Sequence, residues 1–599
     1  MPKFLIRSIT GTLTLPFPYN AILAPGGAVV VSAADEQEII ANLGGLQTLR
    51  AVARISRIPE GTVVTAFSTR TPGFLGETLS IVANASGSDT TGEGTVARPF
   101  RTFQEAARRV PYPLPAGFSA EIDITDLGDE EFPANYALPA WAGSTANVFN
   151  LEFVLSPSIR IVATPRPASG LTVAQRTVNP TSVTTSPVSR TTSVQDTSQS
   201  WDAGSLKDLI ATYEVDGEPF SAVIYDNTAD TIFLCGNDSQ PVAPVIGEVL
   251  TIKEHSARFI TTNEQFGFSG GFNIVNTCNL FIHGVNFDTA PESFTSLYCF
   301  GTPVWFENCR FVQPYFDTSP RQYYTVKCSM AEPVFESIMY IAGTSIRDGG
   351  IRPFQRQGNV GLMIHSGSVL DNTCVQIGDG LIGGVDVGTS LSMSNVLIKN
   401  APADAVKLIG GTSTISCVEV IDAAGNALYF HGPGRHFIKA ITGTGNGGVG
   451  VSVDDGAQVE ALTQNGTGDS LEFFPEYASV VLTDAGANFE KYIDNSEGPR
   501  VITITGSTSP ANDGTFIVIA VFDANNMAYR NPSGVTEAFG AGTWTIDPVT
   551  VTGSDNQQVG DLGPAAYPSL PFNLVDWTYD PTAGAPTQVT GTGGRFFNS

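Results

Sequence analysis

The sequence predicts a mainly β fold in which a parallel β-helix, a solenoid of short stacked strands, makes up most of the chain. Among its 599 residues, 62 are glycine and 38 are proline, while only 15% are charged. This balance suits many short strands joined by tight turns. A short apolar pattern also recurs every 21 to 23 residues. The chain is too long for one ordinary core, so a solenoid or several domains must organise it.

Five copies of the apolar pattern lie between residues 361 and 453. In each copy the second and fourth residues are apolar, which puts two side chains inward and one outward in a strand. A glycine follows each copy, where the chain has to turn a corner. One coil of a parallel β-helix has this length, because a coil buries its apolar face only when stacked on its neighbours. The copies are 361–364, 384–387, 405–408, 427–430 and 450–453, followed by Gly367, Gly388, Gly410, Gly432 and Gly456.

A short amphipathic helix is expected directly after a glycine-rich turn that begins at Gly87. Thr102 and Glu105 have the spacing of a capping box. The apolar stripe of this helix consists of Phe103, Ala106, Ala107 and Val110. A helix here would cover the open end of a β-helix, which otherwise exposes unpaired backbone and apolar core.

This stretch, GSDTTGEG followed by RPFRTFQEAA, closely resembles the start of the β-helix in phage tail spikes and other pectate-lyase-like proteins. The resemblance covers about 25 residues of the chain. It implies a right-handed parallel β-helix, a homotrimer and a place on a virion. It does not imply an activity, because that superfamily includes lyases, hydrolases and structural shafts.

The chain divides into six expected segments. A small α+β domain has strands over 3–6, 12–15 and 28–31 and a helix over 34–54, and it is placed to attach the β-helix to other virion proteins. Two small β units, one inserted and one C-terminal, are similar to modules of phage structural proteins. The expected bounds are 1–80 for the attachment domain, 81–180 for the capping helix and first coils, 181–255 for the inserted β unit, 256–475 for the β-helix, 476–550 for the C-terminal β domain and 551–599 for an extended tail.

Charge and composition argue against several classes of partner. The formal net charge is −27, from 31 basic and 58 acidic residues, and no stretch concentrates enough Lys and Arg to bind nucleic acid. The same charge favours neutral glycans or protein surfaces over strongly anionic polysaccharides. No segment is long and apolar enough for membrane insertion, and no N-terminal signal is recognisable. The seven cysteines and five histidines form no metal-ligand cluster, so neither metal nor cofactor is expected.

Catalytic residues cannot be assigned from the sequence. Polysaccharide cleavage needs two carboxylates across a groove, or a base with a cation in a lyase. Carboxylates one coil apart would lie about 4.8 Å from each other, yet Asp at a coil corner more often caps backbone groups. The lone His431 does not define a catalytic site either. The candidates are Asp348, Asp371, Asp379, Asp386, Asp404, Glu419 and Asp422.

Ligand contact is expected in the irregular region 312–357, where aromatic and arginine side chains gather. Sugar rings stack on aromatic faces and their hydroxyl groups accept hydrogen bonds from arginine. These aromatics could equally pack against a neighbouring subunit. The expected ligand-binding residues are Tyr315, Tyr323, Tyr324, Arg347, Arg352 and Phe354.

The sequence therefore favours a structural virion component of the tail-spike or tail-fibre type that attaches by its N-terminus and presents a β-helix to a host-surface glycan. It would be assembled in the host cytoplasm and exposed on the released particle. Two alternatives stay open. One is an enzyme, a polysaccharide depolymerase of the hydrolase or lyase type. The other is an architectural baseplate, collar or head fibre protein without a host ligand.

Overall fold

A computed structural model gives the fold, and the described residues are mainly β, as the sequence predicts. The largest sheet they form has 25 strands and is dominated by parallel pairing. The structure describes residues 3–8, 13–15, 21–23, 28–32, 53–58, 63–66, 77–110, 119–132, 158–215, 217–236, 243–261, 272–275, 279–289, 295–300, 304–312, 324–330, 337–348, 350–355, 360–377, 389–453, 457–461, 464–487, 489, 500–539, 542–547, 549–553 and 595–598.

The N-terminal strands form two small antiparallel sheets. In one, β1 (Lys3–Ser8) lies between β4 (Ala28–Ser32) and β5 (Ala53–Ile58); in the other, β2 (Leu13–Leu15) pairs with β3 (Ala21–Leu23). The helix expected over 34–54 lies outside the described residues except at its end, where the expectation is wrong. Ala53 and Arg54 belong to β5 because that segment pairs along β1.

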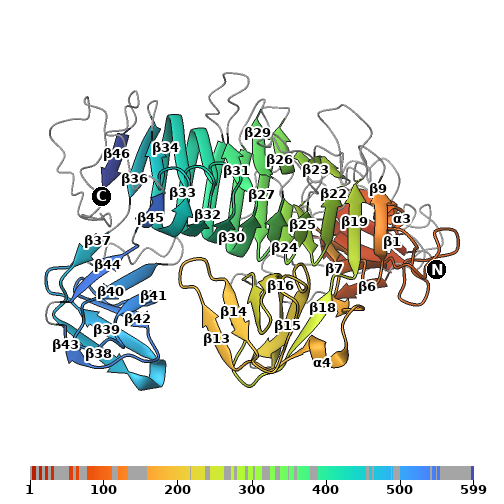
Figure 1. Ribbon diagram of the computed structural model, residues 1–599. Coiled ribbons are helices and arrows are strands. Elements are labelled where there is room, and N and C mark those ends of the chain that lie inside the picture. The colour runs from red at the N-terminus through yellow and green to blue at the C-terminus, as the bar shows by residue number, and fades with distance from the viewer. Residues whose placement is uncertain are drawn as a thin grey trace.

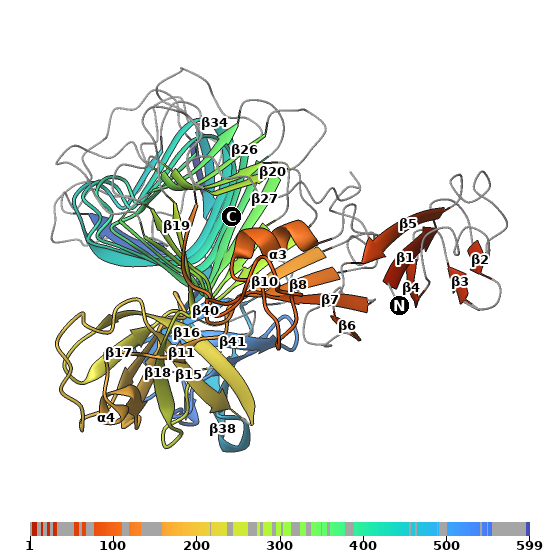
Figure 2. The ribbon, with the colours of Figure 1, turned by 90° about the vertical axis from the view of Figure 1, so that its right-hand side faces the viewer.

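The parallel strands of the large sheet, called the parallel stack here, run along three faces (Figures 1 and 2). Each strand from β20 to β26 pairs in parallel with the strand three further along the chain. Face A contains β7 (Glu77–Val82), β8 (Ser119–Asp123), β10 (Ser158–Val162), β21 (Asn279–His283), β24 (Val304–Glu307), β27 (Ser337–Ala342), β36 (Ala457–Ala461) and β46 (Arg595–Asn598), with β6 (Val63–Ala66) antiparallel to β7. Face B contains β9 (Gly128–Phe132), β19 (Ala257–Thr261), β22 (Asn286–Thr289), β25 (Arg310–Val312), β28 (Ser345–Arg347) and β45 (Val549–Gly553).

Face C and four long strands complete the stack. Face C contains β20 (Phe272–Val275), β23 (Thr295–Phe300), β26 (Tyr324–Met330), β29 (Gly350–Gln355), β31 (Cys374–Ile377) and β35 (Val451–Val453). Two long strands, β30 (Val360–Asp371) and β32 (Thr389–Lys399), pass from face A to face B. Two more, β33 (Val406–Ile421) and β34 (Leu428–Asn446), pass from face C through A to B.

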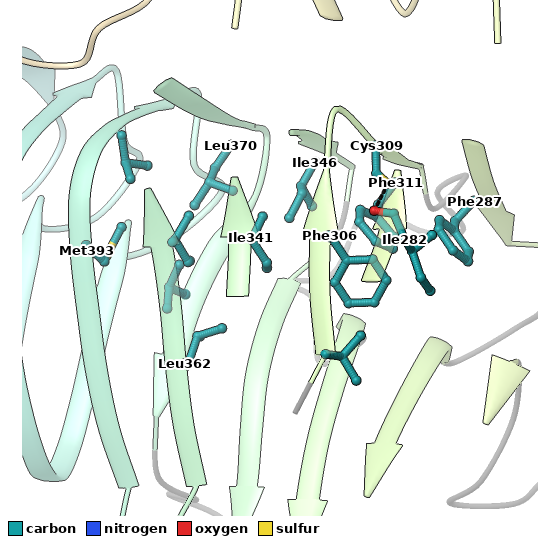
Figure 3. Packing of buried hydrophobic residues seen from close by; sticks show 14 of the residues in the cluster. Ile282, Phe287, Phe306, Cys309, Phe311, Ile341, Ile346, Leu362, Leu370 and Met393 are labelled. Atoms are coloured by element: carbon teal, nitrogen blue, oxygen red, sulfur yellow. Dashed lines mark hydrogen bonds between the residues drawn. The ribbon is translucent and has the colours of Figure 1, made fainter. Parts of the chain in front are cut away.

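Buried side chains are stacked in register inside the three faces. Phe259, Phe287 and Phe311 occupy matching positions of β19, β22 and β25. The rings of Phe287 and Phe311 are nearly parallel, with centroids 4.8 Å apart. Figure 3 shows these rings beside Phe306 and the aliphatic side chains of the following coils. One continuous core, extending from Leu79 to Val459, therefore runs through the stack.

The repeat seen in the sequence corresponds to two different faces. Residues 405–408, 427–430 and 450–453 align on face C, since Val406 pairs with Leu428 and Leu428 with Val451. The corners after the first two have glycine at positive φ, at Gly410 (79°) and Gly432 (75°). The first copy, 361–364, instead lies on face A and pairs with β32. Both faces share the apolar alternation, so the pattern alone did not separate them. Residues 384–387 lie outside the described residues.

The predicted capping helix is confirmed as α3 (Phe103–Arg109), with the Thr102 hydroxyl accepting from the Glu105 backbone N–H. Its start is held by a second carboxylate, Glu130 of β9. Glu130 accepts from the backbone N–H groups of Phe103 (2.6 Å) and Gln104 (3.2 Å). Burial raises the pKa of Glu130 to about 7, although these two hydrogen bonds oppose the rise.

A compact β unit is inserted between β10 and β19 and packs beneath the stack in Figure 1. Its strands start at 166, ahead of residue 181, where the sequence suggested its start, so part of the Thr- and Ser-rich stretch is sheet. The unit contains β11 (Arg166–Pro167), α4 (Val173–Arg176), β12 (Thr177–Val178), β13 (Ser182–Thr185), β14 (Thr192–Gln195), β15 (Ile210–Val215), β16 (Glu218–Asn227), β17 (Thr231–Leu234) and β18 (Leu250–Glu254).

A second β unit follows β36, after which the chain returns to the stack. It has its own core around Trp544 and Tyr529. Its elements are β37 (Gln464–Gly466), β38 (Ser470–Phe474), η2 (Pro475–Tyr477), β39 (Ser479–Thr483), β40 (Val501–Thr505), β41 (Gly514–Val521), β42 (Asn526–Arg530), β43 (Glu537–Ala538) and β44 (Thr543–Ile546). Beyond it, β45 pairs with β34 and β46 pairs with β36, both in parallel.

Replacing Glu130 tests its role beneath α3. A carboxyl group whose folded pKa lies above its ordinary value of 4.5 stabilises the fold fully below pH 4.5, and this contribution is lost as the pH rises through 7. The free energy of unfolding of the wild type should therefore fall by about 2–3 kcal/mol between pH 4.5 and 8. Glu130→Gln should not show this fall. Glu130→Ala should cost about 1–2 kcal/mol throughout, because two helix N–H groups lose their acceptor.

Denaturant unfolding at several pH values measures both effects. Glu131→Gln, which changes the exposed neighbouring carboxylate, is the matched control. Equal pH dependence of the wild type and Glu130→Gln would contradict this account of the α3 cap.

Candidate functional site

Two aromatic rings are stacked on the outer side of face A. Phe281 of β21 and Trp305 of β24 are partners in the parallel register. Their ring centroids are 4.5 Å apart and the rings are inclined by only 8°. Both side chains are partly exposed, whereas the residues on either side of each, such as Ile282 and Phe306, are buried. We call Phe281 and Trp305 the aromatic platform.

Polar groups border the aromatic platform along the stack and along its strands. The position next to Phe281 on β10 is Arg160, which pairs with Glu121 at 3.1 Å. Two residues further along the platform strands lie His283 and Glu307, which are also partners in register. An apolar surface with a few polar groups at its edge is the usual composition of a ligand site.

The corner beside the platform contains a dense group of buried polar atoms without a partner among the described residues. Asn308 donates from Nδ2 to His283 Nε2 at 3.2 Å, which leaves the proton of a neutral His283 on Nδ1. His255 Nδ1 donates to the Gly284 carbonyl oxygen at 2.9 Å, which leaves Nε2 as an acceptor. The unpartnered atoms are His255 Nε2, Ser256 Oγ, His283 Nδ1, Glu307 Oε1, Asn308 Oδ1 and Arg310 Nε.

Buried polar groups of this kind are normally satisfied by ordered water. Burial is the main reason why the pKa of His255 and that of His283 are both lowered to about 4. Both imidazoles are therefore neutral at pH 7.

A ladder of opposite charges joins face B to the inserted unit. Asp208 of that unit accepts from Arg310 at 2.9 Å and from Arg347, whose Nε lies 3.1 Å away. Lys207 of the same unit pairs with Asp371 at 2.6 Å. Burial opposes the ionisation of Asp371, but its hydrogen bonds to Lys207 and Asn400 outweigh burial and its pKa is lowered.

Apolar and backbone contacts close the same interface. Val223, Tyr225 and Cys235 of the inserted unit pack against Val369 and Leu397. Gly236 N–H donates to the Gly367 carbonyl oxygen at 2.9 Å, and a Cβ on Gly367 would lie 2.3 Å from that nitrogen. Glycine at position 367 is therefore required twice: its positive φ allows the turn at the corner, and its missing side chain allows Gly236 of the inserted unit to approach.

Of the described carboxylates that were candidates for catalysis, Asp422 lies at a corner and the others have structural partners. Besides Asp371, Asp348 pairs with Arg347 and accepts from Asn372, and Glu419 accepts from Ser189 at 2.9 Å. Asp404 accepts from the Asn426 backbone N–H, and Asp422 has a positive φ of 54° at a corner. His431 contacts the Tyr429 hydroxyl at 3.4 Å. Asp379 and Asp386 lie outside the described residues.

The expected ligand-binding residues fall on two faces. Arg347 is on β28 of face B, where its guanidinium binds Asp208 and Asp348, so it holds the inserted unit. Tyr324 lies on β26, and Arg352 and Phe354 lie on β29, both strands of face C. Tyr315 and Tyr323 lie outside the described residues. Ligand binding by this set stays a prediction.

Sequence reasoning missed the aromatic platform. Its signal was available as the alternation in Asn279–His283 and Val304–Glu307, where one large aromatic side chain lies between two buried apolar residues. An outward aromatic looks like any other strand residue until the register puts two of them side by side.

Metal and membrane features are not found in the described part of the chain. Its His, Cys, Asp and Glu side chains form no group of three that could hold a metal ion. Its helices include none that is long and apolar enough to cross a membrane.

The fold is mainly β, with a large, predominantly parallel sheet that is β-helix-like in arrangement. No protein-family model matches the sequence, and no curated protein does. Solved structures it is similar to include the tailspike protein gp49 from Pseudomonas phage LKA1, at 11% identity over 72% of this chain and 86% of that chain, with a TM-score of 0.14. Another is the Gp54 tailspike of Acinetobacter baumannii bacteriophage AP22, in complex with A. baumannii capsular saccharide, at 8% identity over 72% and 90%, also with a TM-score of 0.14. At this TM-score neither likeness is evidence for the function of this chain.

Removing the charge of Asp208 tests the docking of the inserted unit. Asp208→Asn keeps the shape and the tolerance for a positive φ of 75°, but leaves Arg310 and Arg347 with less compensation in a buried interface. Loss of one partner of a buried ion pair costs about 3–5 kcal/mol. Hydrogen exchange at the Gly236 amide, which bonds to the stack, should speed up at least tenfold. Asp202→Asn, an exposed carboxylate of the same unit, should leave that exchange unchanged.

Acid should weaken the same interface through its histidines. A histidine whose folded pKa is near 4 contributes stability above its ordinary pKa of 6.5 and loses it as the pH falls toward 4. Each imidazole accounts for on the order of 2–3 kcal/mol. In the double variant His255→Asn and His283→Gln, where each amide replaces the bonded ring nitrogen, unfolding should depend less on pH between 6.5 and 4. An unchanged pH profile of unfolding would count against buried neutral imidazoles.

Proposed function

We propose that this chain is a structural virion protein of the phage tail-spike type, a right-handed parallel β-helix that binds a host-surface glycan through the aromatic platform. The observation that carries the proposal is the pair of parallel, stacked and partly exposed rings of Phe281 and Trp305 on the outer side of the sheet. Sugar rings present apolar C–H faces that pack against exposed aromatic side chains, and their hydroxyl groups bond to polar side chains nearby.

The position of the platform supports recognition of an extended ligand. Parallel neighbours lie about 4.8 Å apart, so the two stacked rings form one continuous apolar ridge along the stack axis. Arg160 continues this column on one side. On the other side the column continues through Tyr340 and then Met363, as the register places them. A polymer lying along the stack would meet these positions in sequence.

Binding is favoured over cleavage by the state of the carboxylates. Among the described candidates each is bound to a lysine, an arginine, a serine or a backbone group, or lies at a corner. A general acid or base needs a carboxyl group that faces the substrate at a suitable distance from a second one. The platform therefore supports a binding role.

Trimerisation and attachment complete the proposal. A homotrimer would shield faces of the stack that a lone chain leaves open to solvent. The N-terminal strands β1 to β5 precede the stack and pair among themselves. Such a separate unit suits the attachment to other virion proteins that is expected of residues 1–80, although β6 and β7 at the end of that range belong to the large sheet.

The platform is tested by Trp305→Ala. Loss of a stacking surface should weaken glycan binding about tenfold or more, since a desolvated aromatic contact is a dominant contributor at a carbohydrate site. The measurement is binding of the full-length protein to an array of bacterial capsular and lipopolysaccharide glycans. Tyr477→Ala, which removes an aromatic side chain that is 72% exposed on the C-terminal unit, is the control. Equal glycan binding by Trp305→Ala and the wild type would exclude the platform as the site.

A further inference from the structure

Both β units reach the same edge of the stack, the corner at which β33 and β34 pass from face A to face B. Val188 of the inserted unit and Val501 of the C-terminal unit pack there against Cys417 and Ala440. In Figure 1 both units lie beneath the stack, and β13 and β14 are on the side of the inserted unit that faces β41. Three parts of the molecule therefore meet at one place, which we call the junction.

The turn between β13 and β14 brings Arg190 of the inserted unit to the junction. This turn is fixed on the stack by two hydrogen bonds. The Val188 carbonyl oxygen accepts from Asn395 Nδ2 at 2.8 Å, and Ser189 Oγ donates to Glu419 at 2.9 Å. Arg190 itself has a positive φ of 61° and its side chain is half-buried. The position of its guanidinium is therefore set by the docked turn.

Arg190 has no counterion among the residues that the structure describes. Its Nε atom is buried without a hydrogen-bond partner, and no described carboxylate forms an ion pair with its guanidinium. Burial is the main cause that lowers the pKa of Arg190; Cys417 opposes the lowering, and the charge of Arg530 adds to it. A buried cation is normally compensated by a carboxylate or by hydrogen-bond acceptors. Arg190 therefore lacks the compensation that its burial calls for.

The C-terminal unit brings a second arginine to the junction. Arg530 ends β42 and is exposed, so solvent reaches the junction from this side. In the described part of the chain it has no ion pair either. Two like charges that approach one another from two docked units repel, unless an anion lies between them.

The described carboxylates near the junction are bound elsewhere. Asp547 accepts from Arg500 at 2.7 Å and from the Val501 backbone N–H at 3.0 Å. Glu419 accepts from two serine hydroxyl groups of the β13–β14 turn and is not among the groups that act on the pKa of Arg190. An anion for the two uncompensated arginines therefore has to come from outside the described residues.

We propose that Arg190 and Arg530 bind a phosphate group between the inserted unit and the C-terminal unit. A guanidinium presents a planar fork of N–H groups that bonds two oxygens of a phosphate at once. Two such forks on two units suit a tetrahedral anion, whereas the two oxygens of a carboxylate lie in one plane. The bound anion compensates both arginines and links the two units. This inference goes beyond glycan binding and uses no residue of the aromatic platform.

The experiment is calorimetric titration of the full-length protein with inorganic phosphate at constant ionic strength. The wild type should bind one phosphate per chain. Arg190→Gln and Arg530→Gln should each weaken binding about fivefold or more, since each removes a charge-assisted contact. Arg190→Lys keeps the charge without the fork and should also weaken it. Lys253→Gln on β18 removes a charge from the same unit and is the matched control, which should bind phosphate as the wild type does.

Thermal unfolding separates a ligand-binding arginine from a merely structural one. Without phosphate, Arg190→Gln should unfold at the same temperature as the wild type or at a higher one, because it removes a buried charge that has no counterion. Phosphate should raise the Tm of the wild type but not that of Arg190→Gln. A lower Tm of Arg190→Gln without phosphate would mean that the chain itself compensates Arg190, and would overturn the inference.

Glycerol 3-phosphate distinguishes two sources of the phosphate group. If it binds as tightly as inorganic phosphate, the junction takes phosphoryl groups of larger molecules; if it does not bind, the ligand is the free ion, and both results support the site. The inference is overturned if the wild type shows no saturable phosphate binding, if acetate binds as tightly as phosphate, or if both arginine-to-glutamine variants bind phosphate as the wild type does. The glycan-array result for Trp305→Ala is independent of all these outcomes.

Discussion

The parallel register of the buried side chains is the constraint on which the rest of the molecule depends. Phe259, Phe287 and Phe311 follow one another in register, and the next strands continue the same inward position with Ile346 and Leu370. A strand that slipped by one residue would bring its outward side chains into this core. The register therefore fixes the outer surface as firmly as the inner one, because successive residues of a strand alternate between them.

Each outer face consequently has its own chemistry. Face B presents arginines and carboxylates that are used by the inserted unit, as Arg310 and Arg347 bind Asp208. Face A presents the stacked rings of Phe281 and Trp305. Face C presents cations without carboxylates on its described strands. Because each column runs along the stack axis, each face offers a linear array suited to a polymeric partner or to a second sheet.

The junction with the inserted unit combines strong ion pairs with buried polar atoms that have no partner among the described residues. Buried charges stabilise an interface only when they are compensated, and here Lys207 and Asp371 compensate each other. The imidazoles of His255 and His283 remain neutral in the same region, and their unpaired nitrogens call for water. Docking of this unit is thus expected to depend on pH, through histidines that are not part of the aromatic platform.

The sequence by itself determined the mainly β class and the helix that starts at Phe103, since these follow from local alternation and capping. It did not determine which face a repeat occupies, so residues 361–364 were aligned with strands of another face. It also grouped Arg347 with Arg352, although the first is a docking arginine at the end of β28 on face B and the second lies on β29 of face C. Only the tertiary structure decided these points, because a surface column is assembled from residues more than 20 positions apart, and their pairing is a property of the stacked register.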